Sequence, residues 1–439
     1  MVPWWKSLAR CVWGLGRPFG RPAGRLLLAG FLCSVVGTIL PAGPVPRPAS
    51  GDTSDFIAEH VLLARLGSEH LAHAICRRGA KGERIVAWGE RILEWQPVGP
   101  GQAREVVPVK PGLAYSNGGC SLDLDGDGVD ELVVARGEGR WGRNPELLWF
   151  QEGSGRDTWV EHAVERLPGA PKDAPHDIEP ISFVIASGER VPGVAVLVSR
   201  RQLLWYEIPN PPTNPWRRRE IGVFPGKEQH SGLAVGDVAG RGRPDVVCGM
   251  FWAECPADPT AEPWKLHRYG RWDDGGWGGM AKVALADLDG DGRQEIVASE
   301  AEIPQARLSV FQRSASDPDA PWNEVSVDRD LYCPHSLVLP DIDGDSRAEI
   351  IVGEMTAGGW DFPLNPSPKI FVYRNEGNLR FRKSTLVSGW GVHEMGVAPA
   401  RADGRVLVFA ADEIQPQKFP EMQTHVSTWT ITPRPPSHR

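Results

Sequence analysis

The sequence predicts an all-β fold, a seven-bladed β-propeller of four-stranded blades, from two kinds of repeat. The first is an acidic loop that precedes an apolar strand, and the second is a pair of later strands marked by aromatic residues. Both recur about every fifty residues, and four short strands in a unit of that length are typical of a propeller blade. The composition agrees, because 50 Gly and 40 Pro suit many turns and 41% hydrophobic residues can fill a core in a 439-residue chain.

The acidic loop is clearest at Asp287-Leu-Asp-Gly-Asp-Gly-Arg-Gln-Glu295. Its carboxylates stand at positions 1, 3, 5 and 9, which is the spacing of oxygen ligands in an EF-hand-like calcium loop. Three aspartates packed so closely repel one another, and a hard cation relieves that repulsion. The β-branched run Ile296-Val-Ala-Ser follows at once, so we expect the loop to join two strands.

Two further intact copies and one degenerate copy repeat this loop. The degenerate copy runs from Asp237 to Asp245, with Ala239 and Arg241 in place of the second and third carboxylates, and we expect it to bind no ion. The intact copies predict about three bound Ca²⁺, held by Asp123, Asp125, Asp127 and Glu131, by Asp287, Asp289, Asp291 and Glu295, and by Asp341, Asp343, Asp345 and Glu349. The alternative is that these loops are solvated acidic turns that bind nothing.

The strands around these loops can be counted into seven units. Blades are expected to begin near residues 68, 115, 174, 228, 277, 333 and 391. A fourth strand often opens with a tryptophan that we expect to pack between blades: Trp159, Trp216, Trp264 and Trp322. The last unit is one strand short, and Phe56-Ile-Ala-Glu-His-Val-Leu matches the fourth-strand pattern. We therefore expect this N-terminal strand to complete the last blade and close the ring.

The first fifty residues have the character of a targeting segment. They contain six basic residues and no acidic one, and an apolar run of fifteen residues covers 26–40. That length fits the core of a signal peptide better than a membrane span, so we expect export to the periplasm or the extracellular space. An uncleaved membrane anchor is the alternative. The predicted domains are a signal peptide and Pro-rich linker at 1–50, the propeller at 51–433 and a C-terminal tail at 434–439.

The charge of the chain argues against a nucleic-acid partner. Without the six positive charges of residues 1–50, the formal net charge falls from −8 to −14, whereas a nucleic-acid binder should present a basic face. Three Ca²⁺ would return the charge to about −8. After the signal segment come five cysteines without metal-ligand spacing, which we expect to be buried thiols with at most two disulfides. We expect a monomer.

Histidines open five of the expected first strands: His70, His176, His230, His335 and His393. First strands line the axis of a propeller, so these imidazoles should gather at one mouth of the channel, opposite the acidic loops. Carboxylates flank the histidines or end the second strands on the same side: Asp177, Glu179, Glu394, Glu300, Glu302, Glu354 and Glu413. Such a set would hold a divalent metal or act as acid and base on a sugar. The alternative is that the histidines hydrogen-bond neighbouring blades.

Other histidines and tryptophans lie outside these patterns. We expect packing or surface roles for His60, His73, His162, His267 and His425. Five tryptophans break the repeat, several of them in Gly-rich segments, and either bind a carbohydrate or pack within their loops: Trp252, Trp272, Trp277, Trp360 and Trp390. No phosphate-binding loop, nucleophile elbow or His-Glu-x-x-His motif is present in the sequence.

The Asp-x-Asp-Gly-Asp-Gly loops between strands resemble the FG-GAP and VCBS repeats of bacterial exported proteins and integrin α-subunit propellers, over roughly residues 55–432. This resemblance implies a calcium-braced propeller, and such repeats serve adhesion, carbohydrate binding and catalysis. A narrower resemblance is to the propeller of aldos-2-ulose dehydratases, carried by His230-Ser-Gly-Leu-Ala-Val-Gly-Asp237, Trp205-Tyr-Glu-Ile-Pro209 and Pro215-Trp216. Those enzymes also carry cupin-like domains, for which we expect no room in this chain.

Three functions remain open. We favour a binding module that presents the histidine face to a polysaccharide or a cell-surface protein, because propeller repeats need carry no catalytic chemistry. The second is a metal-assisted sugar lyase or dehydratase with one further divalent metal at the channel mouth. In that enzyme His176, His230, His335 and His393 would be ligands or bases, and Glu300, Glu354 or Glu413 would be the acid. The third is a scaffold without a site.

Overall fold

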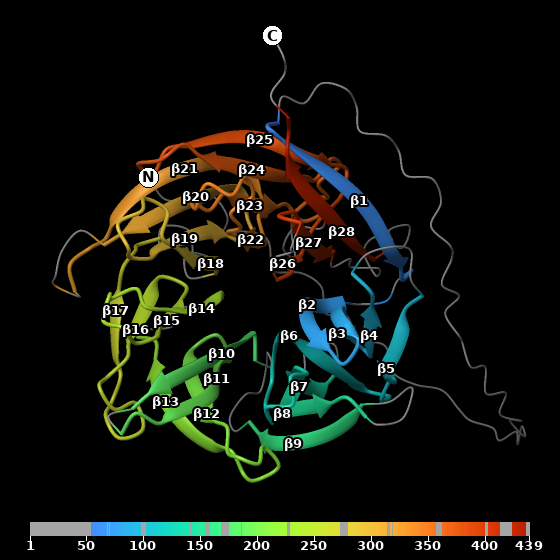
Figure 1. Ribbon diagram of the computed structural model, residues 1–439, viewed down its shortest axis with the longest axis vertical. Helices are drawn as coiled ribbons and strands as arrows, with labels where there is room; N and C mark the ends of the chain where they lie inside the picture. Colours follow the sequence, from blue (N-terminus) through green and yellow to red (C-terminus); the bar gives the residue numbers. More distant parts are fainter. Residues whose placement is uncertain are drawn as a thin grey trace, which may run out of the picture. The chain divides into compact units, whose positions relative to one another are not determined.

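The structure, a computed structural model, describes residues 54–67, 69, 71–97, 102–139, 143–153, 159–167, 175–185, 187–225, 229–272, 280–313, 317, 319–356, 362–399, 403–412 and 424–435. Within these residues the chain forms 28 β-strands in seven antiparallel four-stranded sheets. The sheets are the blades of a ring (Figure 1). The seven-bladed propeller expected from the sequence is therefore confirmed. The expected signal segment at 1–50 lies outside the described residues.

In each blade the first strand lies next to the axis and the following strands lie progressively farther out (Figure 1). Blades 1 to 3 consist of β2 (Leu71–Gly79), β3 (Gly82–Gly89), β4 (Ile92–Trp95) and β5 (Arg104–Val107); β6 (Leu113–Leu122), β7 (Glu131–Glu138), β8 (Arg143–Gln151) and β9 (Val160–Arg166); β10 (Asp177–Val184), β11 (Arg190–Val198), β12 (Gln202–Glu207) and β13 (Arg217–Val223). Blades 4 and 5 consist of β14 (Leu233–Gly236), β15 (Asp245–Cys248), β16 (Phe251–Glu254) and β17 (Lys265–Arg268); β18 (Ala281–Ala286), β19 (Glu295–Glu300), β20 (Pro304–Gln312) and β21 (Asn323–Tyr332).

Blade 6 consists of β22 (Ser336–Val338), β23 (Ile350–Gly353), β24 (Lys369–Asn375) and β25 (Phe381–Ser388). Blade 7 joins the two ends of the ring, because β26 (Glu394–Val397), β27 (Val406–Ala411) and β28 (His425–Pro433) are completed by β1 (Phe56–Arg65). The register of β1 against β28 runs antiparallel from Phe56 opposite Pro433 to Arg65 opposite His425. The closure of the ring by the N-terminal strand is thus as the sequence predicts.

The core is divided among the junctions between blades. Seven clusters of buried apolar side chains lie within the described residues, one at each junction between neighbouring blades. Second strands are covered on both faces and therefore read as continuous apolar runs, such as Leu132–Ala135 of β7, where every side chain is fully buried. Trp159, Trp264 and Trp322 extend from one blade onto the preceding one, which confirms their expected packing role.

This topology gives the ring two functionally different faces. The first strand of every blade lies next to the axis, as Figure 1 shows, and neighbouring first strands contact one another around the whole ring. Four of the expected site histidines, His176, His230, His335 and His393, stand where first strands begin, and the acidic loops follow where first strands end. The two sets of residues therefore lie at opposite ends of the inner strands. Among the described residues, no helix has the length and apolar character needed to cross a membrane.

The closing strand allows a direct test of ring stability. Phe56 is 3% exposed and packs at the junction of blades 6 and 7, whereas its neighbour Ile57 is 37% exposed. We expect Phe56→Ala to lower the free energy of unfolding by about 3–5 kcal/mol, because it leaves a cavity in this junction. Ile57→Ala is the control and should change stability by less than about 1 kcal/mol. Equal losses in chemical denaturation would show that β1 does not depend on its buried face.

Candidate functional site

The three intact acidic loops share one hydrogen-bond pattern. In blade 5, both oxygens of Asp287 accept backbone N–H groups, from Gly290 at 2.8 Å and Gly292 at 2.9 Å. Leu288 donates its N–H to Oε2 of Glu295 at 2.8 Å. The equivalent bonds recur in blades 2 and 6 with closely similar lengths. These bonds turn the carboxylates toward one another. In each loop, three carboxylates place oxygen atoms within 4.8 Å of one another, as a cation site requires.

The glutamate at position 9 is the buried member of each loop. Glu131, Glu295 and Glu349 are at most 2% exposed, and burial together with the neighbouring aspartates raises the pKa of each to about 7. In blade 6, Oε1 of Glu349 is buried and has no hydrogen-bond partner among the described residues. An oxygen in that situation is costly unless a cation or a proton compensates it. The donor set, all carboxylate oxygen, fits Ca²⁺ rather than a softer metal.

The degenerate loop of blade 4 supplies its own cation. The guanidinium of Arg241 donates to Oδ1 of Asp245 at 2.7 Å and also reaches Glu254, which ends the third strand. The backbone N–H of Arg241 donates to Asp237 at 2.8 Å, so the loop keeps its turn. Asp245 is fully buried, and burial raises its pKa to about 6. An arginine therefore stands where the other loops offer carboxylates, which agrees with the expectation that this loop binds no ion.

At the opposite end of the inner strands lies a buried cluster of charged groups centred on Glu394. Nζ of Lys282, from blade 5, donates to Oε1 of Glu394 at 2.7 Å, and Nδ1 of His73, from blade 1, lies 3.3 Å from Oε2. Burial lowers the pKa of Lys282, but Glu394, Asp177 and Glu179 raise it overall, so the ammonium stays charged. Burial raises the pKa of Glu394, yet Lys282 and His73 hold it well below its usual value. The cluster thus joins blades 1, 3, 5 and 7.

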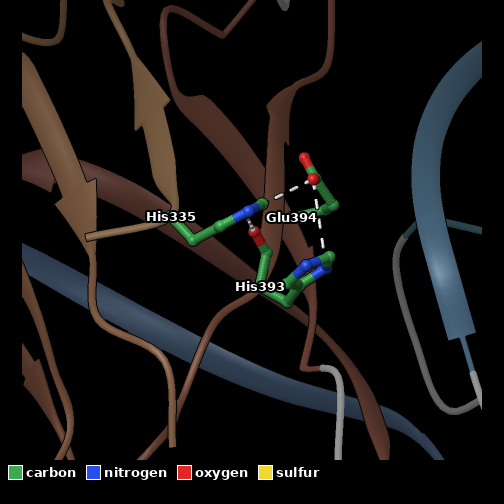
Figure 2. Close-up of side chains that lie close together, drawn as sticks. All are labelled: His335, His393 and Glu394. Carbon is green, nitrogen blue, oxygen red and sulfur yellow. Dashed lines mark hydrogen bonds and ion pairs between the residues drawn. The ribbon is translucent and has the colours of Figure 1, made fainter. Parts of the chain in front are cut away.

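His335 and His393 lie against this carboxylate (Figure 2). Nδ1 of His335 donates to the backbone carbonyl of His393 at 2.9 Å. Nε2, on the other side of the ring, is therefore the nitrogen that can accept a proton. Their rings stack with centroids 4.2 Å apart and planes 16° apart. Nitrogen lone pairs lie in the ring plane, so two stacked rings cannot aim both lone pairs at one ion. His335, His393 and Glu394 lie close enough to share a metal ion, but this ring orientation and the bound Lys282 do not fit one.

A second carboxylate, Glu302, lies on the other side of His335. Nε2 of His335 is 3.7 Å from Oε1 of Glu302. Burial raises the pKa of Glu302, but His335, Arg200 and His176 bring it down to about 2. His176 donates Nδ1–H to Asp177 at 2.8 Å, while its Nε2 is buried and makes no hydrogen bond among the described residues. In both His335 and His176, Nδ1 therefore carries the hydrogen of the bond that orients the ring, and Nε2 lies on the opposite side of the ring from that bond.

The acidic residues of blade 3 differ sharply in charge. Burial raises the pKa of Asp177, but His176 and Lys282 lower it to about 2. Burial and the charges of Asp177 and Glu394 raise the pKa of nearby Glu179 to about 8. Near neutral pH one carboxyl is an anion and the other carries a proton. Carboxyl groups whose environments separate their pKa values in this way are characteristic of acid and base pairs.

The structure does not place every expected site residue in this cluster. Glu300 accepts the backbone N–H of Arg307 at 2.8 Å and its guanidinium at 2.6 Å, and Glu354 accepts the backbone N–H groups of Tyr332 and Lys369. Both glutamates thus brace strands, and none of these bonds reaches a histidine of the cluster. His230 is fully buried and packs against Phe224 and Phe251. Glu413 and His70 lie outside the described residues.

Two members of the cluster were missed by sequence reasoning. His73 was expected to be a packing residue but contacts Glu394, and Lys282 was not considered. The signal that could have found both is their position near the start of a first strand, the strand that lies next to the axis. Glu302, Asp177 and Glu179 belong to the carboxylates expected on this face, but the sequence assigns them no individual role.

The remaining histidines and tryptophans mostly pack. His162, His267 and His60 each lie opposite a third-strand tryptophan and stack on it, with centroids 3.9, 4.6 and 5.0 Å apart. Trp252 and Trp272 are 1% exposed and so cannot offer a face to a sugar. Trp390 packs against His60 and His425, while Trp277 and Trp360 lie outside the described residues. Among the described cysteines, Cys76, Cys120, Cys248 and Cys255 are free thiols, and Cys333 is buried.

Comparison with known proteins gives a distant relative. No family model matches the chain, so its membership of the FG-GAP or VCBS repeats is not established. An aldos-2-ulose dehydratase from Phanerodontia chrysosporium is 22% identical over 303 residues, which cover 61% of this chain. The match spans 31% of that relative's length. The chain is thus similar to part of a protein named as a sugar dehydratase.

The internal cation of blade 4 can be tested by its removal. Arg241→Ala leaves the buried carboxylate of Asp245 without its guanidinium, so we expect the free energy of unfolding to fall by about 3–5 kcal/mol. The matched control is Arg405→Ala, because Arg405 pairs with Asp403 on the surface, with exposures of 49% and 37%. That change should stay within about 1 kcal/mol. Similar losses for both variants in denaturant titrations would contradict the role of Arg241.

Proposed function

We propose that this protein is an exported, calcium-braced propeller that binds a carbohydrate at the axial cluster formed by Glu394, Lys282, His335, His393 and Glu302. The observation that carries the proposal is that these ionisable groups meet at the inner ends of different blades, with His335, His393 and Glu394 buried and Lys282 and Glu302 only 13% and 15% exposed. Buried ion pairs contribute little to net stability, and strongly perturbed pKa values gather at functional sites. A cluster of this kind is therefore better explained by a ligand than by the need to hold the ring together.

The calcium proposal rests on the three acidic loops. Each would hold one Ca²⁺ through the aspartates at positions 1, 3 and 5 and the buried glutamate at position 9, which gives the unpartnered Oε1 of Glu349 a ligand. The bound ions would offset the repulsion among these carboxylates and fix the connection between first and second strands. Loops of this kind bind weakly enough to need extracellular calcium levels, which agrees with an exported protein.

A carbohydrate fits the axial cluster better than the other partners considered. Sugars offer many hydroxyl groups, and Glu394, Glu302 and Lys282 supply charged acceptors and donors that form strong hydrogen bonds with hydroxyls. The relative named as a sugar dehydratase supports the same class of ligand. The acidic composition disfavours a nucleic-acid partner, because a nucleic-acid binder needs a basic face. We propose that the protein acts as a monomer.

A second candidate function, elimination of water from a sugar, is favoured by the two oriented imidazoles. Nε2 of His335 or His176 would act as the base that takes a proton from the carbon next to a sugar carbonyl. Glu179, with its pKa of about 8, would give its proton to the departing hydroxyl, and the charged Lys282 would stabilise the developing enolate. A Schiff base is not favoured, because Lys282 keeps its proton. The step needs no metal, in line with the stacked rings of His335 and His393.

The calcium proposal predicts a metal content. Dialysed against trace calcium, zinc and manganese, the purified protein should contain about three Ca²⁺ per chain by elemental analysis. Glu295→Gln should remove one of them, because it neutralises the only buried carboxylate of that loop. The control is Glu376→Gln, which alters a surface carboxylate paired with Arg382 and should retain all three. A protein without calcium, or an unchanged content in Glu295→Gln, would refute this part of the proposal.

The axial site predicts separable binding and chemistry. A panel of polysaccharides and 2-ulose sugars is tested for binding by calorimetry and for elimination by the absorbance of the conjugated product. We expect Lys282→Met to abolish detectable binding, and His335→Gln to slow elimination by about 100-fold or more while binding persists. His267→Gln is the matched control, since His267 is equally buried but lies on an outer strand. Binding without product would leave a binding module, and no binding by any sugar would overturn both functions.

A further inference from the structure

The three intact acidic loops differ in the cations that lie against them. In blade 5 no arginine or lysine among the described residues pairs with Asp287, Asp289 or Asp291. In blade 2 the exposed Arg78 lies 3.6 Å from Asp123. Blade 6 is the most heavily compensated, because its loop carboxylates meet two arginines.

In blade 6 these two arginines contact neighbouring ligand positions. Nη2 of Arg374 lies 2.9 Å from Oδ2 of Asp343, and Arg347 pairs with Asp345. The third strands of blades 2 and 5 end instead in glutamines, where Gln151 and Gln312 donate to the position-3 aspartates. The same structural position is therefore neutral in two blades and positively charged in the third.

Arg374 also reaches the strand that closes the ring. Its Nη1 lies 3.4 Å from Oδ2 of Asp55, the residue directly before β1. The same carboxylate meets Arg382 of β25, and the backbone carbonyl of Asp55 accepts the N–H of Arg434. The Arg374 side chain is 39% exposed, and it contacts both carboxylates at once. One guanidinium is thus shared between an acidic loop of blade 6 and the start of the closing strand.

We propose that Arg374 is an intramolecular competitor of the cation in the blade 6 loop, and that filling this loop transfers Arg374 from Asp343 to Asp55. The inference rests on the proposed binding of Ca²⁺. A divalent ion that takes Asp343 as a ligand both occupies the carboxylate and repels the nearby guanidinium. Asp55 is the acceptor already within reach. Blade 6 is then the weakest of the three sites, and its occupancy strengthens the anchoring of β1.

Linkage gives the two partners of Arg374 opposite effects on calcium. Because calcium and Asp55 both act on the same arginine, whatever draws Arg374 toward Asp55 must raise the affinity of the loop. Asp55→Asn removes that attraction, so Arg374 stays on Asp343 and the affinity falls. Arg374→Gln removes the competitor and restores the residue type found in blades 2 and 5, so the affinity rises. General damage to the fold would move both variants in the same direction.

The test follows hydrogen exchange by mass spectrometry on the purified protein over a series of free Ca²⁺ concentrations. The peptide covering 341–349 reports the blade 6 loop, 287–295 reports the blade 5 loop, and 56–65 reports the closing strand. We expect the calcium midpoint at 341–349 to rise about 5-fold or more in Asp55→Asn and to fall by a similar factor in Arg374→Gln. Calcium should also slow exchange in 56–65, and this effect should vanish in Arg374→Gln.

Controls separate the inference from the function on which it rests. The midpoint at 287–295 should be unchanged in both variants, and Asp55→Asn should have no further effect on 341–349 in an Arg374→Gln background. If no loop peptide responds to Ca²⁺, the proposed calcium binding is wrong. If 341–349 responds but its midpoint is the same in both variants, or shifts in one direction, calcium binds and the role of Arg374 is overturned.

Discussion

Every blade of this protein needs a neighbour on both of its faces, and that constraint governs the rest of the structure. The inner strands carry apolar side chains on both sides, so a blade at the end of an open row would expose half of its core. The pairing of β1 with β28 removes this problem, because it supplies the missing strand of blade 7 and lets blade 7 cover blade 1. The closure therefore depends on β1 and β28, which are far apart in sequence but neighbours in the sheet.

In blades 2, 4, 5 and 6 the connection between first and second strands has one electrostatic problem, which is solved in two ways. Each of the three intact copies crowds four carboxylates into nine residues, the blade 4 copy keeps two, and the carboxylate at position 9 is buried in all four. In blade 4 the guanidinium of Arg241 sits among Asp245 and Glu254, so the loop is compensated within the chain. The other three loops keep their carboxylates. A side chain near the end of the third strand contacts the position-3 aspartate, and it is a neutral glutamine in blades 2 and 5 but Arg374 in blade 6. The charge next to the carboxylates therefore differs among the copies of this repeat, and the proposal of unequal cation sites rests on that difference.

The axial cluster differs from these loops because its partners come from several blades, and two of these, blades 5 and 7, are not adjacent in the ring. Lys282 and Glu394 belong to blades 5 and 7, and His73 reaches the same carboxylate from blade 1. Two imidazoles have their tautomers fixed, one by a carbonyl and one by a carboxylate. Such fixed orientations matter little for packing, but they matter for a group that must accept a proton at a defined atom. The arrangement thus favours a site over a simple ionic support.

The sequence by itself determined the fold, the number of blades, the closing strand and the acidic loops. These features are written in local patterns, namely carboxylates at fixed spacing, apolar runs and fourth-strand tryptophans, and local patterns survive without knowledge of distant contacts. The sequence also indicated that histidines would reach the axis. Only the tertiary structure decided which of them meet: His335 and His393 stack, His230 packs among aromatic rings, and His73 joins the cluster. Glu300 and Glu354 look catalytic in the sequence but brace strands, because Glu300 is held by the backbone N–H and guanidinium of Arg307, and Glu354 by the backbone N–H groups of Tyr332 and Lys369. Partners 112 residues apart, such as Lys282 and Glu394, are set by the distance across the axis, which no local pattern encodes.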